Sequence, residues 1–172
     1  MPVEIEFKYV LDPTNLEELL KDISTICVDI KQVYIEKGIR FRSLKQSSHT
    51  EYEFTYKTKI EVGHLEINKH VSEDDFNLAL MKSRTILHKK RYIIDKKHKW
   101  EIDFFIDDKM ETYFCMMECE VSNPDIIPDI NELPEFIRER IIKNVVLDDQ
   151  RYSSYNISNV DYAKHLLISE SK

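Results

Sequence analysis

The sequence predicts an α+β protein whose centre is an eight-stranded antiparallel β-barrel with helices packed outside it. Apolar and polar residues alternate in about eight segments, the pattern of strands that bury one face. Most segments follow one another directly, and nearly every one carries a pair of charged residues on the same face. The chain has 172 residues, the length of one domain.

The strands are predicted from alternation along the chain. In the first segment, apolar residues at odd positions from Val3 to Tyr9 alternate with charged residues from Glu4 to Lys8. Gly38 marks a turn between the second and third segments. We expect strands at 3–9, 32–36, 39–42, 51–60, 64–70, 86–95, 99–106 and 112–121.

Helices are expected between and after these strands. A stripe of leucines behind Pro13 predicts a helix at about 13–24. Ser72 and Asp75 form a capping-box pattern for a helix at 72–83. After Val121 the alternation of apolar and polar residues ends, and Pro124, Pro128 and Pro134 mark a loop. Helices are expected near 134–143 and 159–168, with a polar segment at 147–156 between them. We therefore expect one domain over 1–172, with a C-terminal helical or lid segment at about 122–172.

Composition excludes several classes of protein. The chain has two glycines, Gly38 and Gly63, so neither a Walker loop nor a GxGxxG loop can be built. A net charge of −7 argues against broad nucleic-acid binding and against binding to acidic membranes. Three cysteines without a CxxC motif, and no evident signal segment, predict a cytoplasmic protein. We expect a monomer or homodimer.

The charged faces are unusual because acids pair with acids and bases with bases. Like charges on neighbouring strands repel unless a ligand lies between them, so a closed barrel around a ligand is favoured over a solvated sheet. The charged pairs, each at positions i and i+2, are Glu4 and Glu6, Arg40 and Arg42, Lys57 and Lys59, Lys89 and Arg91, Glu101 and Asp103, and Glu118 and Glu120.

These pairs have a clear chemical meaning. Two carboxylates at i and i+2 lie about 7 Å apart along a strand, and a second pair on a neighbouring strand completes an all-oxygen site for Mg²⁺ or Mn²⁺. Paired arginines and lysines grip phosphate oxygens with their side chains. Together they predict a site for a metal ion and a polyphosphate.

At these residues the sequence resembles the CYTH family, or triphosphate tunnel metalloenzymes. Glu4 to Lys8 match the family's ExExK signature, and the later charged pairs follow in the family's order down to Arg151 and Tyr152. The resemblance covers residues 3 to about 156 and implies an eight-stranded tunnel that binds triphosphates with a divalent metal. The sequence departs from the family at His64, where many members have another acid, and at Leu147, where a threonine is common.

The pattern and the resemblance together assign a role to each candidate residue. We expect Glu4, Glu6, Glu118 and Glu120 to hold the main ion, with Asp103 as a further metal ligand and Glu66 and Glu101 as candidates for a second ion or for orienting water. The triphosphate would be held by Arg40, Arg42, Lys57, Lys59, Lys89, Arg91 and Arg151. Lys8 would connect metal and phosphate, and the resemblance implies that Lys89 and Arg91 form a basic dyad near the attacking water.

We expect a metal-dependent triphosphatase that hydrolyses inorganic tripolyphosphate to pyrophosphate and phosphate. The first alternative is a class IV adenylyl cyclase, which would make cyclic AMP from ATP with the same phosphate clamp. Nucleoside, thiamine and RNA triphosphatases remain open, as does a binder of nucleotides or polyphosphate that performs no catalysis. A binder could dispense with the metal-binding acids, so the complete acid set favours an enzyme.

Overall fold

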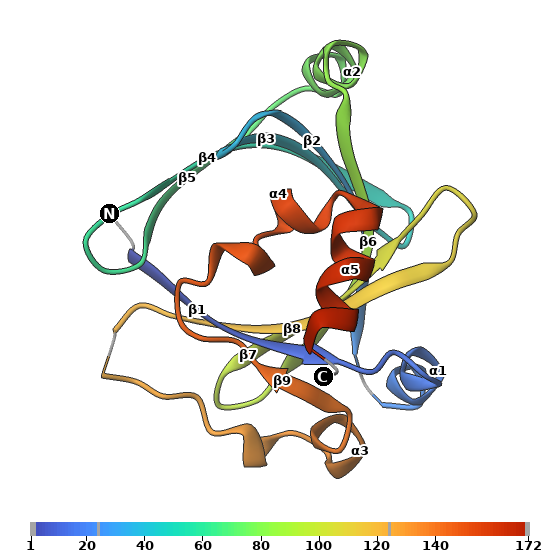
Figure 1. Ribbon diagram of the computed structural model, residues 1–172. Helices are drawn as coiled ribbons and strands as arrows, with labels where there is room; N and C mark the ends of the chain where they lie inside the picture. The colour runs from blue at the N-terminus through green and yellow to red at the C-terminus, as the bar shows by residue number, and fades with distance from the viewer. Residues whose placement is uncertain (1–2, 24, 124, 171–172) are drawn as a thin grey trace.

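The computed structural model describes residues 3–23, 25–123 and 125–170, and its centre is a closed antiparallel β-barrel (Figure 1). In these residues, nine strands follow the order β5-β4-β3-β2-β6-β7-β8-β1-β9, and β5 also pairs with β1. They are β1 (Val3–Leu11), β2 (Ile26–Glu36), β3 (Ile39–Gln46), β4 (His49–Lys59), β5 (His64–His70), β6 (Thr85–Asp95), β7 (Lys99–Ile106), β8 (Thr112–Val121) and β9 (Ile141–Asn144). The eight-stranded barrel predicted from the sequence is confirmed, with β9 as an additional strand.

One edge of β1 closes the barrel. Val3 and Glu4 pair with Leu65 and His64 of β5, and further along the same edge Tyr9 to Leu11 pair with β9. Gly63 precedes β5 in a left-handed backbone conformation, with φ +77°, and a Cβ there would lie 2.4 Å from the Glu4 carbonyl oxygen. Glycine therefore allows the β4–β5 turn to approach β1 closely enough for closure.

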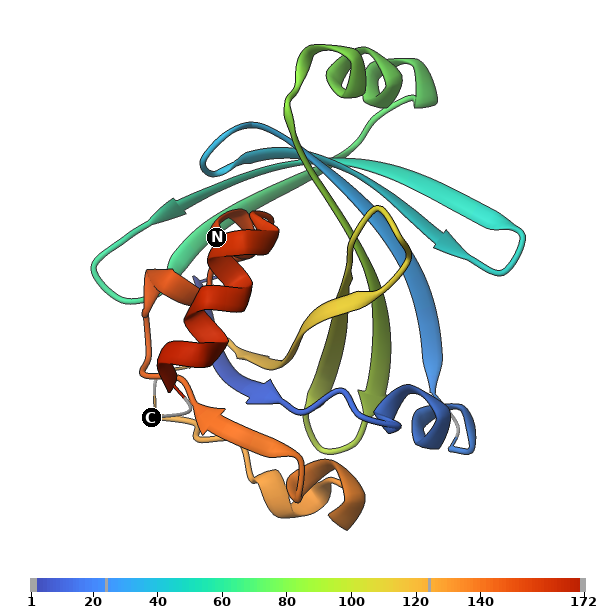
Figure 2. The same ribbon diagram turned by 45° about the vertical axis from the view of Figure 1, so that its right-hand side comes forward.

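Within the described residues, three helices lie outside the barrel (Figures 1 and 2). They are α1 (Leu16–Lys21), α2 (Glu73–Lys82) and α3 (Glu135–Arg138), the last preceded by a 3-10 turn, η1 (Ile130–Glu132). In α2 the predicted capping box is present, because Ser72 and Asp75 satisfy each other's backbone N–H groups. No helix in the described ranges is long and apolar enough to cross a membrane.

The C-terminal residues occupy one end of the barrel interior instead of its outside. They form η2 (Gln150–Tyr152), α4 (Ser154–Ile157) and α5 (Val160–Glu170), and in Figure 1 α4 and α5 lie across the ring of strands. Tyr152, Ile157 and Leu166 pack against apolar side chains of the barrel strands. These barrel residues include Val10, Leu87, Phe105, Phe114 and Met116. The inward faces of β1, β6, β7 and β8 are therefore apolar at this end and charged toward the other.

Three sequence predictions need correction. The helix expected near 134–143 ends at Arg138, and Ile141–Asn144 form β9 because the free edge of β1 offers hydrogen bonds to β-branched residues. The strand expected at 32–36 begins at Ile26. The helix expected at about 13–24 runs from Leu16 to Lys21, and Ser24 and Pro124 lie outside the described residues.

Candidate active site

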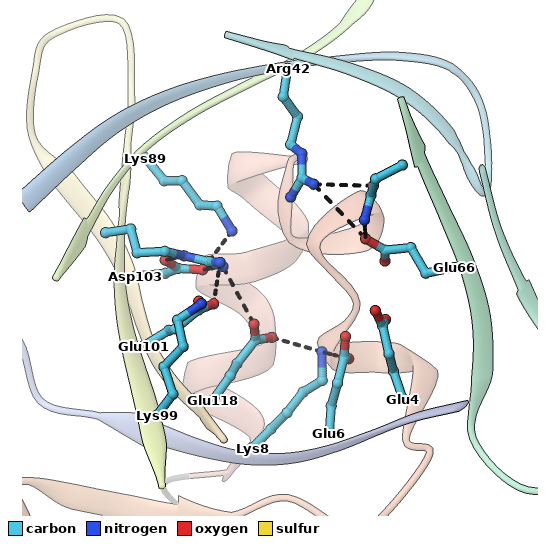
Figure 3. A network of polar contacts seen from close by, with 12 residues as sticks. Glu4, Glu6, Lys8, Arg42, Glu66, Lys89, Lys99, Glu101, Asp103 and Glu118 are labelled. Atoms are coloured by element: carbon cyan, nitrogen blue, oxygen red, sulfur yellow. Dashed lines mark hydrogen bonds and ion pairs between the residues drawn. The ribbon is translucent and has the colours of Figure 1, made fainter. Parts of the chain in front are cut away.

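The inward charged residues surround a cavity with a volume of about 700 Å³, a size common for small-molecule sites. Figure 3 shows some of their side chains, among them Glu6, Arg42 and Lys89, pointing into the barrel from several strands. The predicted site residues that line the cavity are Glu4, Glu6, Lys8, Arg40, Arg42, Lys57, Lys59, Glu66, Lys89, Arg91, Glu101, Glu118 and Glu120.

Four of these carboxylates form an acidic cluster near the line of closure: Glu4 and Glu6 on β1, Glu66 on β5 and Glu120 on β8. Nζ of Lys57 lies 3.4 Å from Oε2 of Glu4 and 3.5 Å from Oε2 of Glu66, and it also contacts Glu6. Burial raises the pKa of Glu4 to about 7, and the carboxylates of Glu66 and Glu120 act in the same direction. Burial and the Glu6 carboxylate also raise the pKa of Glu120. The single positive charge of Lys57 therefore does not balance the carboxylates of the acidic cluster.

Lys8 lies between Glu6 of the acidic cluster and Glu118, a carboxylate outside the cluster (Figure 3). Its Nζ lies 2.8 Å from Oε2 of Glu6 and 2.8 Å from Oε1 of Glu118, which faces Lys8 across the β1–β8 ladder. Burial opposes the charge on Lys8, but the two carboxylates raise its pKa above the ordinary lysine value. Burial also opposes ionisation of Glu6, yet Lys8 and Lys57 hold its pKa well below the ordinary value.

Lys89, Arg91 and Asp103 form a second group, here called the Asp103 triad. Asp103 faces Arg91 across the β6–β7 ladder, accepts hydrogen bonds of 2.7 Å from Nε and Nη2 of Arg91, and accepts one of 2.5 Å from Nζ of Lys89. Burial opposes its ionisation, but Arg91 and Lys89 hold the pKa of Asp103 below the ordinary value. Burial, reinforced by Arg91, lowers the pKa of Lys89 to about 8, although Asp103 and Glu118 act in the opposite direction. A neutral amine is therefore accessible near physiological pH.

Arg40 and Arg42 on β3 supply cations to the opposite wall. Nη2 of Arg42 lies 2.7 Å from Oε2 of Glu53, and Nη2 of Arg40 lies 3.5 Å from Oε2 of Glu66. Burial and the neighbouring Arg40 lower the pKa of Arg42 to about 10, so its guanidinium remains charged at neutral pH. The Nε atoms of both arginines are buried without a hydrogen-bond partner. Unsatisfied cationic donors in a cavity are suited to an anionic ligand.

The acidic cluster has the donor chemistry of a site for Mg²⁺ or Mn²⁺, because these ions prefer carboxylate oxygens. Burial and neighbouring carboxylates raise the pKa of Glu4 and of Glu120. Burial opposes ionisation of Glu6 and Glu66 as well, but neighbouring cations hold their pKa values below the ordinary value. Lys57 stands among three of its carboxylates, where it serves as a monovalent counter-ion. Among the described residues, no group of three or more His, Cys, Asp or Glu side chains is already gathered closely enough to coordinate a metal.

Other proteins of dissimilar sequence have the same arrangement of strands. The crystal structure of the inorganic triphosphatase NE1496 aligns over 92% of this chain and 95% of its own, with a TM-score of 0.53 and 20% identity. A putative adenylate cyclase from Bacillus halodurans aligns over 88% of this chain and 98% of its own, with a TM-score of 0.56 and 16% identity. The chain has the CYTH, or triphosphate tunnel, fold.

The likeness lies in structure more than in sequence. A second structure of NE1496, described as a hypothetical protein, aligns with a TM-score of 0.51 and 21% identity over 90% of this chain and 97% of its own. Neither the known sequence families nor the curated proteins gave a match to this chain. The triphosphate tunnel fold is therefore shared, while the chemistry must be argued from the side chains.

Two predicted site residues do not line the cavity. Asp103 is fully buried beneath Lys89 and Arg91. Arg151 pairs with Asp149 at 2.7 Å and its side chain is 54% exposed. Lys59 does line the cavity but lies at its rim, 3.3 Å from Asp148 and 56% exposed.

Sequence reasoning missed several residues that line the cavity. Gln32 and Tyr34 project inward from β2, and Asn68 and Lys99 follow the inward parity of β5 and β7. The alternation that identified Glu66 and Glu101 could have identified Asn68 and Lys99, which lie two positions away in the same strands. Tyr155 of α4 also lines the cavity, and its position depends on the C-terminal segment entering the barrel.

Proposed function

We propose that this protein is a divalent-metal-dependent triphosphatase that hydrolyses inorganic tripolyphosphate to pyrophosphate and phosphate. The proposal rests on one observation: a single cavity holds an acidic cluster on one side and Arg40, Arg42, Lys89 and Arg91 on the others. Carboxylates that lack cationic charge suit a divalent ion, and buried cations suit phosphate oxygens. A metal-bound triphosphate supplies both the divalent ion for the carboxylates and the phosphate oxygens for the buried cations.

The metal would be Mg²⁺ or Mn²⁺, held by Glu4, Glu6, Glu66 and Glu120. When bound, such an ion supplies charge neutralisation for the phosphate oxygens and a fixed position for the triphosphate. This set replaces Glu118 by Glu66 and leaves out Asp103. The hydrogen bonds of Asp103 to Lys89 and Arg91 commit its carboxylate to the Asp103 triad. Glu118 lies between Lys8 and Arg91, and it is not among the carboxylates that act on Glu4. We therefore assign both residues to positioning the neighbouring bases.

The cationic residues bind and orient the substrate. Phosphoryl transfer to water depends mainly on positioning and on stabilising the charge that builds up on the phosphate oxygens. Arg40 and Arg42 have unpaired Nε donors for those oxygens. Lys89 combines a lowered pKa with a place in the cavity, so its neutral form can accept a proton from an attacking water.

A substrate panel tests this function. Inorganic tripolyphosphate, ATP, thiamine triphosphate and 5′-triphosphorylated RNA would each be incubated with Mg²⁺ and with Mn²⁺, and the products identified. We expect orthophosphate and pyrophosphate from tripolyphosphate at the highest kcat/KM, and no release in EDTA. Equal and feeble activity on all four substrates would contradict the assignment.

The same panel distinguishes the alternatives. Cyclic AMP together with pyrophosphate from ATP would identify an adenylyl cyclase, the activity suggested by the description of the Bacillus halodurans structure. Tight binding of tripolyphosphate without turnover under either metal would identify a binding protein. We also propose a cytoplasmic location, which fits a reduced cysteine set: Cys27, Cys115 and Cys119 are free.

A further inference from the structure

Gln32 is a fully buried polar residue inside the barrel that the charged-pair pattern did not include. It lies on β2 between Arg42 of β3 and Leu87 of β6, which face it across the two ladders. Leu87 belongs to the apolar group that packs against the C-terminal residues. Gln32 therefore lies at the boundary between the charged and apolar parts of the interior.

The hydrogen bonds of Gln32 are incomplete. Its Nε2 donates to Oη of Tyr34 at 2.9 Å, while its Oε1 is buried without a hydrogen-bond partner. Arg40 also hydrogen-bonds to Tyr34, so the Tyr34 oxygen accepts from two donors. A buried amide atom without a partner costs free energy unless a ligand or solvent satisfies it.

Rotating the amide by 180° changes which atom lacks a partner. Tyr34 then donates its O–H to Oε1 of Gln32, still accepts from Arg40, and leaves Nε2 of Gln32 without a partner. In either orientation one amide atom needs a partner from outside the protein. An anion selects the orientation that presents the N–H group.

We propose that Gln32 is a further substrate-binding residue, which donates a hydrogen bond from its amide nitrogen to the phosphoryl group that lies deepest in the cavity. The unpaired Nε atoms of Arg40 and Arg42 belong to the same wall, since Arg42 faces Gln32 and Arg40 faces Tyr34. A neutral donor adds a directed contact without adding charge to a wall that already holds two guanidinium groups. This inference rests on the proposed triphosphatase function.

The test uses Gln32→Met, which keeps nearly the same length and removes both polar atoms. We expect the KM for tripolyphosphate with Mg²⁺ to rise roughly 10-fold to 100-fold, the range for losing one hydrogen bond to a charged group. We expect kcat to stay within about threefold, because the acidic cluster and Lys89 are untouched. Tripolyphosphate should also raise the unfolding temperature of the variant less than that of the wild type.

Gln32→Glu gives an independent reading, because it keeps the shape and puts an anion against the substrate. Its KM should rise at least as much, and this variant decides the matter if Gln32→Met fails to fold. The same glutamine-to-methionine change at the exposed Gln46, near the end of β3, should leave both KM and the thermal shift unchanged.

The outcomes separate the two ideas. If the wild type hydrolyses tripolyphosphate and both Gln32 variants keep its KM and thermal shift, the role of Gln32 is wrong and the proposed function stands. If tripolyphosphate neither shifts the unfolding temperature of the wild type nor is hydrolysed, the proposed function is wrong and Gln32 loses its ligand with it.

Discussion

The Asp103 triad and the acidic cluster are built from the same residue types but balance their charges in opposite ways. In the triad, two cations surround one carboxylate, and all three side chains are hydrogen-bonded. In the acidic cluster, Lys57 stands among three carboxylates, and the pKa values of Glu4 and Glu120 are raised. The triad is charge-paired within the protein, whereas the proposed function assigns an external cation to the cluster. We expect changes in the triad to alter stability, and changes in the cluster to alter metal binding and activity.

The largest effect is expected from Asp103→Asn. Removing the carboxylate from this buried group leaves the charge of Arg91 with less compensation and removes the interaction that favours the ammonium form of Lys89, which costs about 3–5 kcal/mol of unfolding free energy. Urea unfolding at pH 7 measures this loss. Asp108→Asn, on an exposed turn, is the matched control and should change stability by less than about 0.5 kcal/mol. Equal stability of the two variants would show that the Asp103 triad is not a structural element.

Glu4→Gln should lower activity without lowering stability, in contrast to Asp103→Asn. We expect metal-dependent phosphate release to fall roughly 100-fold, since electrostatic positioning is lost, while the unfolding free energy stays level or rises. It does not fall because the raised pKa of Glu4 means that its charged form is unfavourable in the folded protein. Phosphate-release kinetics and calorimetric titration with Mn²⁺ measure the effect, with Glu18→Gln on the surface of α1 as the control. Near-normal turnover and Mn²⁺ affinity would remove Glu4 from the ligand set.

The pH profile tests the lowered pKa of Lys89. Below about pH 8 the ammonium form dominates in the free protein and cannot accept a proton, so kcat/KM should rise about tenfold per pH unit well below the pKa and level off above it. Lys89→Arg keeps the positive charge and should remove the rise. Initial rates between pH 6.5 and 9.5 at tripolyphosphate concentrations well below KM measure the profile. A rate that is flat or falls between pH 6.5 and 8 would contradict Lys89 as the proton acceptor.

The smallest effect is expected at Arg151, which the sequence placed in the phosphate clamp. Its side chain is half exposed, pairs with Asp149 at the cavity rim and does not itself line the cavity, so Arg151→Ala should change KM by less than about twofold and stability by less than about 1 kcal/mol. Steady-state kinetics and urea unfolding measure the two quantities. A tenfold rise in KM would mean that Arg151 reaches the substrate after all.

The sequence predicted the barrel well because alternation is a local property. Parity along each strand correctly put Glu4, Glu118 and Arg91 on the inner face and Trp100 in the outer core. It also carried the information for Gln32, which lies at an inward position of a strand whose start was placed six residues too late. Gln32 was nevertheless inside the predicted strand, and it was omitted because the site residues were selected as charged pairs and glutamine is neutral.

Pairing between strands could not be predicted in the same way. That Asp103 is buried under two bases depends on the register of β6 against β7, which sets it opposite Arg91. Likewise, β9 forms because β1 has a free edge at Tyr9–Leu11, and nothing within Ile141–Asn144 reveals that edge. The entry of α4 into the barrel depends on apolar positions on four strands that become neighbours only when the sheet forms.

The closure of the barrel links ligand binding to local opening. Within the described residues β1 meets β5 at two residue pairs, so this short ladder should be among the first parts of the sheet to exchange its amide hydrogens with solvent. Glu4 and Glu66 lie on the two strands that this ladder joins, and a cation shared by their carboxylates would hold the strands together. Binding of the cation and protection of these amide hydrogens from exchange would then both depend on the opening and closing of the β1–β5 ladder. A protein without its ligand would keep its overall shape while its barrel opens and recloses at this one line.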